Sequence, residues 1–192
     1  AKGERILEFG DVFSNHGVRG HHRILTTKGM VEDFPHDVLD KYERVDGIVN
    51  RLEGSRPGAA RIVNEDVMAF APSAPYGLIL SISTLEHVGW DETPREPAKL
   101  RAALERLAGM LAPGGLLFLT VPIGYNQEVD RILNDEPARF ARLGFLLRVT
   151  ADNQWRQASW AEVRASRYGT PFPAANAIAV GVIAGPAPSV GR

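Results

Sequence analysis

The amino-acid sequence predicts a doubly wound α/β fold, in which helices cover a mostly parallel β-sheet. Short apolar runs alternate with helical patterns along the chain, and no internal repeat or low-complexity segment interrupts the series. The 192 residues are close to the usual size of one domain and can bury a substantial core. We therefore expect a single domain over residues 1–192, in which the Gly- and Pro-rich residues 185–192 form a flexible tail.

Seven strand-like runs follow one another along the chain. Five belong to alternating strand and helix units and two lie near the end, at 5–10, 37–40, 60–64, 76–83, 116–121, 145–149 and 177–184. The run at 116–121 is apolar at nearly every position, as expected of a parallel strand that is covered on both faces. The alternation predicts a doubly wound, mostly parallel, seven-stranded Rossmann-like sheet.

The clearest helix is expected over residues 97–111. One apolar stripe recurs there at intervals of four, three and four residues, formed by Leu100, Leu104, Leu107 and Leu111. Pro97 suits the first helical turn, and the Pro-Gly-Gly sequence at 113–115 ends the pattern. This helix connects the fourth strand to the fifth.

The composition excludes several classes of function. A formal net charge of −1 argues against binding to nucleic acid or to an anionic membrane, and the arginines between 131 and 167 are interleaved with acids, as on a solvated surface. The absence of cysteine excludes disulfides and thiolate metal sites, and the histidines lack the spacing of a metal site, so we expect no bound metal. No apolar run approaches the roughly 20 residues of a membrane span, so a cytoplasmic protein is expected.

Small and polar residues follow the predicted strands. Gly10, Asp40, Asp66 and Ser83 stand at the strand ends, at the edge of the sheet where open α/β folds bind their ligands. An ordinary turn also explains Gly10, and helix caps or turns also explain the two aspartates. Two acids at the ends of neighbouring parallel strands are nevertheless well placed to accept hydrogen bonds from ribose hydroxyls and an adenine amine. This favours a ligand role, more for Asp40 than for Asp66.

The order of the segments carries a family resemblance. LEFG, HDVLDKY, NEDV, YGLILSISTLEHVGWDE and LAPGGLLFLTVPIGY follow one another in the stretch from residue 5 to residue 125. In this order the sequence resembles the class I S-adenosylmethionine-dependent methyltransferases, in particular the type 11-like group, whose fourth motif ends in a Glu-His pair. The resemblance implies a sheet whose last strand, at 177–184, is antiparallel to the others, S-adenosylmethionine as the cofactor, and a small-molecule methyl acceptor.

The resemblance also implies roles for residues in the first three strand-and-loop units. Glu8 and Gly10 match the acid and the first glycine of the loop whose backbone approaches the methionyl part of the cofactor. Asp40 matches the acid that binds the ribose hydroxyls. Asp66 and the following Val67 match the acid and the apolar neighbour around the adenine.

After the fourth strand, residues 83–87 match the segment that lines the methionyl side and faces the transferred methyl, beginning at Ser83. His87 is the best-placed general base for a hydroxyl acceptor, and Glu86 and Asp91 come next. An ordinary helix start with a packed histidine is the alternative explanation of Glu86 and His87. Four aromatic residues form a wall of the acceptor site or simply pack in the core: Trp90, Tyr125, Trp155 and Trp160.

One departure from the family pattern keeps a second function open. The later glycine positions of the cofactor loop are occupied by Val12 and Ser14, and a side chain at Val12 limits how closely a ligand approaches the backbone. The chain also begins at Ala1 with a strand almost at once, as if an N-terminal segment had been removed or had never been present. We expect an O-methyltransferase acting on a small-molecule or sugar-like hydroxyl, with a non-catalytic binding or assembly domain of the same fold as the alternative.

Overall fold

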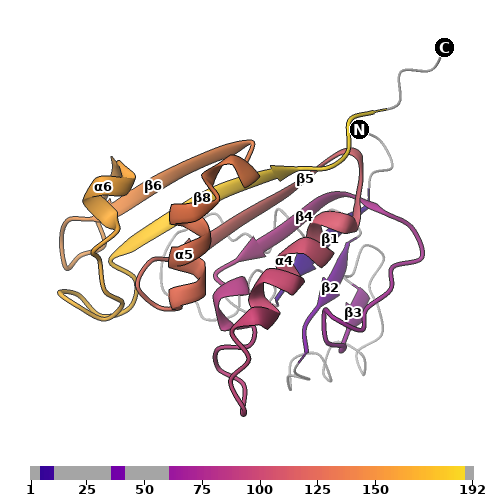
Figure 1. Ribbon diagram of the computed structural model, residues 1–192, viewed down its shortest axis with the longest axis horizontal. Coiled ribbons are helices and arrows are strands. Elements are labelled where there is room, and N and C mark those ends of the chain that lie inside the picture. The colour runs from indigo at the N-terminus through magenta and orange to yellow at the C-terminus, as the bar shows by residue number, and fades with distance from the viewer. Residues whose placement is uncertain (1–4, 11–35, 42–60, 189–192) are drawn as a thin grey trace.

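The computed structural model of the protein describes residues 5–10, 36–41 and 61–188 (Figure 1). The strands of this part are β1 (Ile6–Phe9), β2 (Asp37–Leu39), β3 (Arg61–Val63), β4 (Tyr76–Ile82), β5 (Leu111–Pro122), β6 (Arg142–Arg148), β7 (Trp155–Ala158) and β8 (Ala177–Ala184). The helices are α4 (Ala98–Gly109), α5 (Gln127–Asp135) and α6 (Trp160–Val163), with 3-10 turns η1 (Leu85–His87) and η2 (Pro137–Arg139). Val12 and Ser14, which depart from the family pattern, lie outside the described residues.

All eight described strands form one sheet, in the order β3-β2-β1-β4-β5-β8-β6-β7. The first five strands are parallel to one another, whereas β8 is antiparallel to both β5 and β6, and β7 is antiparallel to β6. The predicted α/β fold with a mostly parallel sheet and an antiparallel last strand is confirmed. The sheet has one strand more than expected, because the short edge strand β7 carries no apolar run that the sequence pattern would reveal.

The Pro-Gly-Gly sequence before the fifth strand forms a bulge inside the strand instead of a turn before it. β5 begins at Leu111, and its pairing with β4 shifts from Tyr76 opposite Leu111 to Leu78 opposite Leu116. A side chain at Gly115 would place its Cβ 2.8 Å from the carbonyl oxygen of Tyr76, so the bulge requires glycine there. The bulge also holds residues of the expected tail, since the Gly185 amide donates to Gly115 O at 2.8 Å and Pro186 O accepts from the Gly114 amide at 2.7 Å.

Two helices cover one face of the sheet, as Figure 1 shows for α4 and α5. The predicted apolar stripe of α4 is buried at Leu100, Leu104 and Leu107, against β5 side chains that include Leu117 and Leu119. α5 was not predicted, although Val129, Ile132 and Leu133 give it an apolar face at helical spacing and are buried. None of the described helices has both the length and the apolar character needed to cross a membrane.

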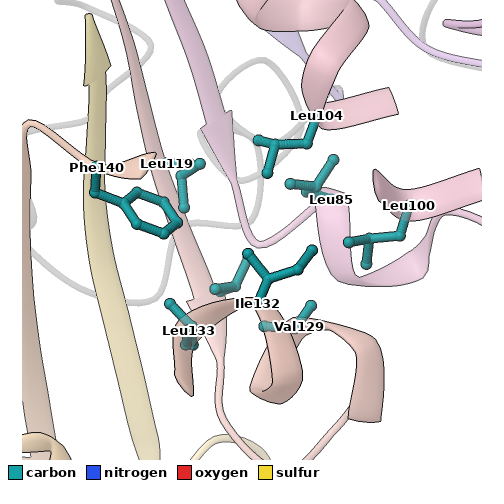
Figure 2. Close-up of a pocket in the computed structure, with 9 residues that line it drawn as sticks. Leu85, Leu100, Leu104, Leu119, Val129, Ile132, Leu133 and Phe140 are labelled. Atoms are coloured by element: carbon teal, nitrogen blue, oxygen red, sulfur yellow. The ribbon is translucent and has the colours of Figure 1, made fainter. Parts of the chain in front are cut away.

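A small cavity lies between this face of the sheet and the two helices (Figure 2). Among the described residues, those that line it have hydrocarbon side chains: Leu85, Leu100, Leu104, Leu119, Val121, Val129, Ile132, Leu133 and Phe140. Because none of these side chains can donate or accept a hydrogen bond, they offer a ligand no orienting group. We interpret it as a packing gap in the core and place the functional site elsewhere.

The amino ends of the parallel strands are joined by one buried carboxylate. Asp37, at the start of β2, accepts hydrogen bonds from Arg5 Nη2 at 2.6 Å, from Arg61 Nε at 2.8 Å and from the Tyr76 hydroxyl at 2.6 Å. These three donors stand before β1 and at the starts of β3 and β4. Burial favours the neutral acid, but the three hydrogen bonds outweigh it and lower the pKa of Asp37 to about 2. We refer to these four residues as the Asp37 anchor.

Replacing Asp37 by asparagine tests the anchor. A lowered pKa means that the carboxylate stabilises the fold fully above the ordinary aspartate pKa of 3.8, and that this contribution is lost as the pH falls through about 2. We expect Asp37→Asn to lower the free energy of unfolding by about 2 kcal/mol at neutral pH. The difference from the wild type should shrink toward zero as the pH approaches 2, which urea unfolding at a series of pH values measures.

The matched control is Asp135→Asn, at the exposed end of α5. It should change the free energy of unfolding by less than about 0.5 kcal/mol. A loss of stability in Asp37→Asn that stays constant across the pH series would show that the charge of Asp37 does not hold the strands.

Candidate functional site

The carboxyl ends of β1 to β5 lie along one edge of the sheet because these strands are parallel (Figure 1). β1 lies between β2 and β4, so the chain order of the strands reverses at β1. Open α/β folds bind ligands at such a switch point, outside the carboxyl ends of the strands. We therefore describe the residues that follow each strand at this edge.

Gly10 closes β1 and touches the segment that follows β4. Its φ of +82° is left-handed, and a Cβ at this position would lie 2.2 Å from Thr84 Oγ1. The Gly10 amide donates to Leu39 O at 2.9 Å, which brings the end of β1 beside the end of β2. Glycine is therefore required here by packing, and the residue is buried.

Glu8 and Asp40 occupy different environments. Glu8 is 2% exposed within β1, and its Oε2 lies 3.7 Å from His36 Nε2. Asp40 follows β2 at the edge itself and is half-buried, and its amide donates to Val63 O at 3.1 Å. Because the Gly10 amide binds the carbonyl oxygen of Leu39, the structure brings Gly10 close to Asp40, the next residue. Glu8 stays buried within β1.

Asp66 and Val67, predicted to surround an adenine, are held by protein groups. Asp66 Oδ1 accepts from the Met68 amide at 2.9 Å and Oδ2 from Lys99 Nζ at 2.7 Å. Burial raises the pKa of Asp66, but the hydrogen bonds from Lys99 and Met68 outweigh it and leave the pKa lowered. The Val67 side chain is buried in the hydrophobic core.

Two lysines and two carboxylates form one network around Asp66. Lys99 Nζ also binds both oxygens of Glu92, at 3.0 and 2.8 Å, and Lys41 Nζ lies 3.1 Å from Glu92 and 3.4 Å from Asp66. Burial raises the pKa of Glu92, and the two lysines more than reverse this. The network balances the charges beyond the ends of β2 and β3.

Ser83 leaves β4 with a strained backbone. Its φ of +45° is left-handed, a conformation that a residue with a side chain seldom adopts. The Ser83 amide donates to Thr120 O at 2.9 Å, so β5 holds it in place. Backbone strain of this kind is concentrated at functional sites, and here it turns the chain from β4 into η1.

A cluster of four titratable residues lies beyond β4 and β5, and we call Glu86, His87, Asp91 and Tyr125 the His87 cluster. His87 Nδ1 lies 2.6 Å from Asp91 Oδ2, and the Tyr125 hydroxyl donates to the two Asp91 oxygens at 2.9 and 2.7 Å. Burial raises the pKa of Asp91, but hydrogen bonds from His87 and Tyr125 outweigh it and lower the pKa. Burial and the hydrogen bond to Asp91 both raise the pKa of Tyr125.

Glu86 is the buried member of the His87 cluster. It is 1% exposed, and among the described residues its Oε2 has no hydrogen-bond partner. Burial, reinforced by the charge of Asp91, raises the pKa of Glu86 to about 8, so this carboxyl group is mostly neutral at pH 7. The Glu86 carbonyl oxygen accepts from Asn126 Nδ2 at 2.8 Å, and Asn126 in turn caps α5 through the Glu128 amide at 2.9 Å.

The geometry assigns the protons of the imidazole. Asp91 is ionised, so its oxygens only accept, and His87 Nδ1 must carry the hydrogen that lies between them. In the neutral imidazole this leaves Nε2, 3.7 Å from Glu86 Oε1, as the nitrogen that can take up a proton. A histidine oriented by a carboxylate in this way is the usual arrangement of a general base.

Several predicted residues meet here and others do not. The structure brings Glu86 and His87 together with Asp91 and with Tyr125, one of the four aromatic residues considered for the acceptor wall. The other three pack elsewhere: Trp90 lies against Arg95, Trp155 binds Asn153, and Trp160 contacts Phe145. Within the described residues, no group of three or more His, Cys, Asp or Glu side chains is arranged to hold a metal ion.

The sequence reasoning missed Tyr168 and Asn126. The Tyr168 ring lies edge-on to Tyr125 with centroids 4.9 Å apart. No sequence motif indicates this contact, because it depends on how the chain between α6 and β8 folds back. Asn126 does carry a signal, since an asparagine before an apolar helical pattern is a typical N-cap.

Comparison with known proteins identifies the fold. No protein-family model matches the sequence, and no curated protein matches it. N-methyltransferase NodS from Bradyrhizobium japonicum WM9, crystallised with S-adenosyl-L-homocysteine, has a TM-score of 0.57 at 14% identity, covering 95% of this chain and 78% of NodS. The 1,6-didemethyltoxoflavin-N1-methyltransferase of Burkholderia thailandensis, with bound 1,6-didemethyltoxoflavin and S-adenosylhomocysteine, has a TM-score of 0.54 at 15% identity, covering 95% and 71%.

A third similar structure is the [4+2]-cyclase SpnF, with a TM-score of 0.59 at 10% identity, covering 97% of this chain and 76% of SpnF. The name of SpnF states a different reaction from the names of the two methyltransferases. The shared fold therefore does not by itself determine the chemistry. At sequence identities this low, the structural likeness establishes the architecture alone. The likeness extends over nearly the whole chain. The protein has the fold of the class I S-adenosylmethionine-dependent methyltransferases.

Proposed function

We propose that the protein is an S-adenosylmethionine-dependent methyltransferase that acts on the hydroxyl group of a small molecule, sugar-like acceptors included. The observation that carries this proposal is the hydrogen-bonded series Tyr125, Asp91 and His87 beyond the ends of β4 and β5. A hydroxyl oxygen becomes a much better nucleophile when a base removes its proton during the transfer. The series supplies such a base one strand away from the switch point.

The residues at the switch point fit the proposed cofactor. Gly10 and Ser83 are both left-handed, and Gly10 is in contact with Thr84, the residue after Ser83. Backbone and small side chains therefore border this part of the edge, where the methionyl portion would lie. Asp40, half-buried beside Gly10, is the carboxylate that we assign to the ribose hydroxyls.

The other proposed cofactor residues act less directly. Both oxygens of Asp66 are engaged by Met68 and Lys99, so Asp66 can shape the adenine end of the site while keeping these bonds. Val67 supports this segment from the core, and Glu8 supports the start of the loop after β1.

The cofactor, when bound, supplies a methyl group on a positively charged sulfur. Its sulfur would leave with the bonding electron pair as a neutral thioether. The proton of the acceptor hydroxyl would pass to His87 Nε2. Asp91 stabilises the imidazolium through Nδ1, and Tyr125 holds Asp91. A positive charge on His87 also favours ionisation of Glu86, whose Oε1 lies 3.7 Å from Nε2.

Titration calorimetry with S-adenosylmethionine and S-adenosylhomocysteine tests the cofactor. We expect both to bind, and Asp40→Ala to weaken binding about tenfold to a hundredfold because a carboxylate that accepts from ribose hydroxyls is lost. Asp135→Asn, far from the edge, should leave the affinity unchanged. If neither compound binds the folded wild type, the protein is not this enzyme and the non-catalytic alternative is favoured.

Replacing His87 by alanine tests the base. The side chain is 48% exposed, so we expect the melting temperature to change little, while the rate of S-adenosylhomocysteine release with a hydroxyl acceptor falls about a hundredfold. Cofactor affinity should stay nearly intact. A lowered melting temperature with an unchanged rate per folded molecule would show instead that His87 only packs or caps η1.

Replacing Asp91 by asparagine tests how the base is oriented, and it needs no acceptor. We expect the neutral ring of wild-type His87 to carry its proton on Nδ1. Asp91→Asn should shift this proton toward Nε2, because the ionised acceptor is gone. Long-range proton–nitrogen NMR, at a pH where the ring is neutral, distinguishes the tautomer protonated on Nδ1 from the tautomer protonated on Nε2. Tyr125→Phe is the control and should keep the Nδ1 form. Equal ring proton distributions in wild type and Asp91→Asn would rule out the orienting role.

A further inference from the structure

One ammonium group joins the proposed adenine end of the site to the loop before α4. Lys99 Nζ donates to Asp66 Oδ2 at 2.7 Å and to both Glu92 oxygens, at 3.0 and 2.8 Å. An ammonium has three N–H donors, so these three bonds use all of them. The Lys99 side chain is only 12% exposed, and hydrogen bonds between a cation and carboxylates are stronger than those between neutral groups.

The position of Lys99 in its helix is explained by the two carboxylates. Lys99 is the second residue of α4, where the positive end of the helix dipole disfavours a cation. Burial lowers the pKa of Lys99, but the hydrogen bonds to Asp66 and Glu92 outweigh it and leave the pKa raised. The bonds to the carboxylates, and not the stability of α4, therefore account for a lysine at this position.

Glu92 ties the loop that carries Asp91, its neighbour in the chain, to the start of α4. Glu92 Oε1 also accepts from the Gly89 amide at 3.3 Å, and Gly89 O accepts from the Glu96 amide at 2.7 Å. The loop is closely folded there, since a Cβ at Gly89 would lie 2.1 Å from Glu96 O. The Asp91 side chain is 44% exposed, so burial alone does not hold it beside the imidazole. The bonds of Glu92 fix the loop from which Asp91 reaches the base.

The ribose end of the proposed cofactor site lies next to the same network. Lys41 follows Asp40, the carboxylate assigned to the ribose hydroxyls, and its Nζ lies 3.1 Å from Glu92 Oε2 and 3.4 Å from Asp66 Oδ2. The Lys41 side chain is 40% exposed, so water and salt screen these pairs more than the pairs of Lys99. Lys99 therefore makes the stronger connection between the two carboxylates.

We infer that Lys99 is a positioning residue for both halves of the proposed reaction: it holds the Asp66 turn at the adenine end and, through Glu92, holds Asp91 where it orients the base. The inference rests on the proposed function and adds a residue that acts through other side chains. Without the ammonium, Asp66 and Glu92 would repel each other, with only the more exposed Lys41 between them. Both segments would then move.

Replacing Lys99 by methionine tests the inference without changing a residue of the His87 cluster. Methionine keeps an unbranched apolar side chain and removes the ammonium. We expect the affinity for S-adenosylhomocysteine to fall about threefold to tenfold, because the Asp66 turn is released. In long-range proton–nitrogen NMR of the neutral His87 ring, the ratio of the Nδ1 form to the Nε2 form should fall about threefold to tenfold, because Asp91 is less well placed. A residue that only stabilised the fold would not change this ratio in the folded protein.

Glu92→Ala separates the two roles of Lys99 and decides the case if Lys99→Met does not fold. This variant keeps the pair of Lys99 and Asp66 and removes the tie to the loop of Asp91. We expect the same shift of the His87 ring toward the Nε2 form. The affinity for S-adenosylhomocysteine should stay within about twofold of the wild type.

The matched control is Arg139→Met. Arg139 also joins two carboxylates, Glu136 at 2.7 Å and Glu105 at 3.5 Å, and its side chain is 24% exposed. Neither carboxylate follows a strand at the edge of the candidate site, so the ring and the affinity should match the wild type.

The outcomes separate this inference from the proposed function. Failure of the wild type to bind S-adenosylhomocysteine would contradict the proposed function itself. With that binding intact, a His87 ring that stays as in the wild type in Lys99→Met or in Glu92→Ala would overturn the inference. An unchanged affinity in Lys99→Met would overturn it as well.

Discussion

The Asp37 anchor sets the geometry on which the rest of the sheet depends. One carboxylate, buried at the start of β2, accepts from groups at the starts of β1, β3 and β4, so four parallel strands are held in register at their amino ends. An ion that is buried must be fully paired, which makes this arrangement specific for one alignment of the strands. The loops at the opposite edge can then depart from regular geometry, as Gly10 and Ser83 do, without shifting the strands.

The edge that carries the candidate site has its own supports, and they come from the second half of the chain. Asn126 joins the start of α5 to the carbonyl oxygen of Glu86, and Gly124 admits the segment that carries Tyr168. Both follow β5 directly. One short turn after β5 therefore positions both the segment of the proposed base and the segment that carries Tyr168, which explains how two segments distant in sequence reach the same place.

The alternation of apolar runs was enough to predict the α/β class, the order of the elements through β5 and the bounds of β8, because periodicity reports burial directly. It did not distinguish the bulge at Gly115 from a turn, since Pro-Gly-Gly suits both. α5 was overlooked although its spacing was readable. His87 and Glu86 followed from the motif order, whereas Tyr168 could not be predicted, because its contact with Tyr125 depends on how the segment between α6 and β8 packs against Gly124.

The position of β8 has a consequence for how the molecule is made. The last strand of the chain lies between β5 and β6, so β6 and β7 join the sheet only through residues 177–184. A chain emerging from the ribosome can pair β1 to β5 in sequence, but the hairpin of β6 and β7 must wait, with one edge open, until the C-terminal strand arrives. This sheet is therefore completed only when β8 inserts between β5 and β6, and termination of synthesis before residue 177 would leave two separated sheet edges exposed to other chains.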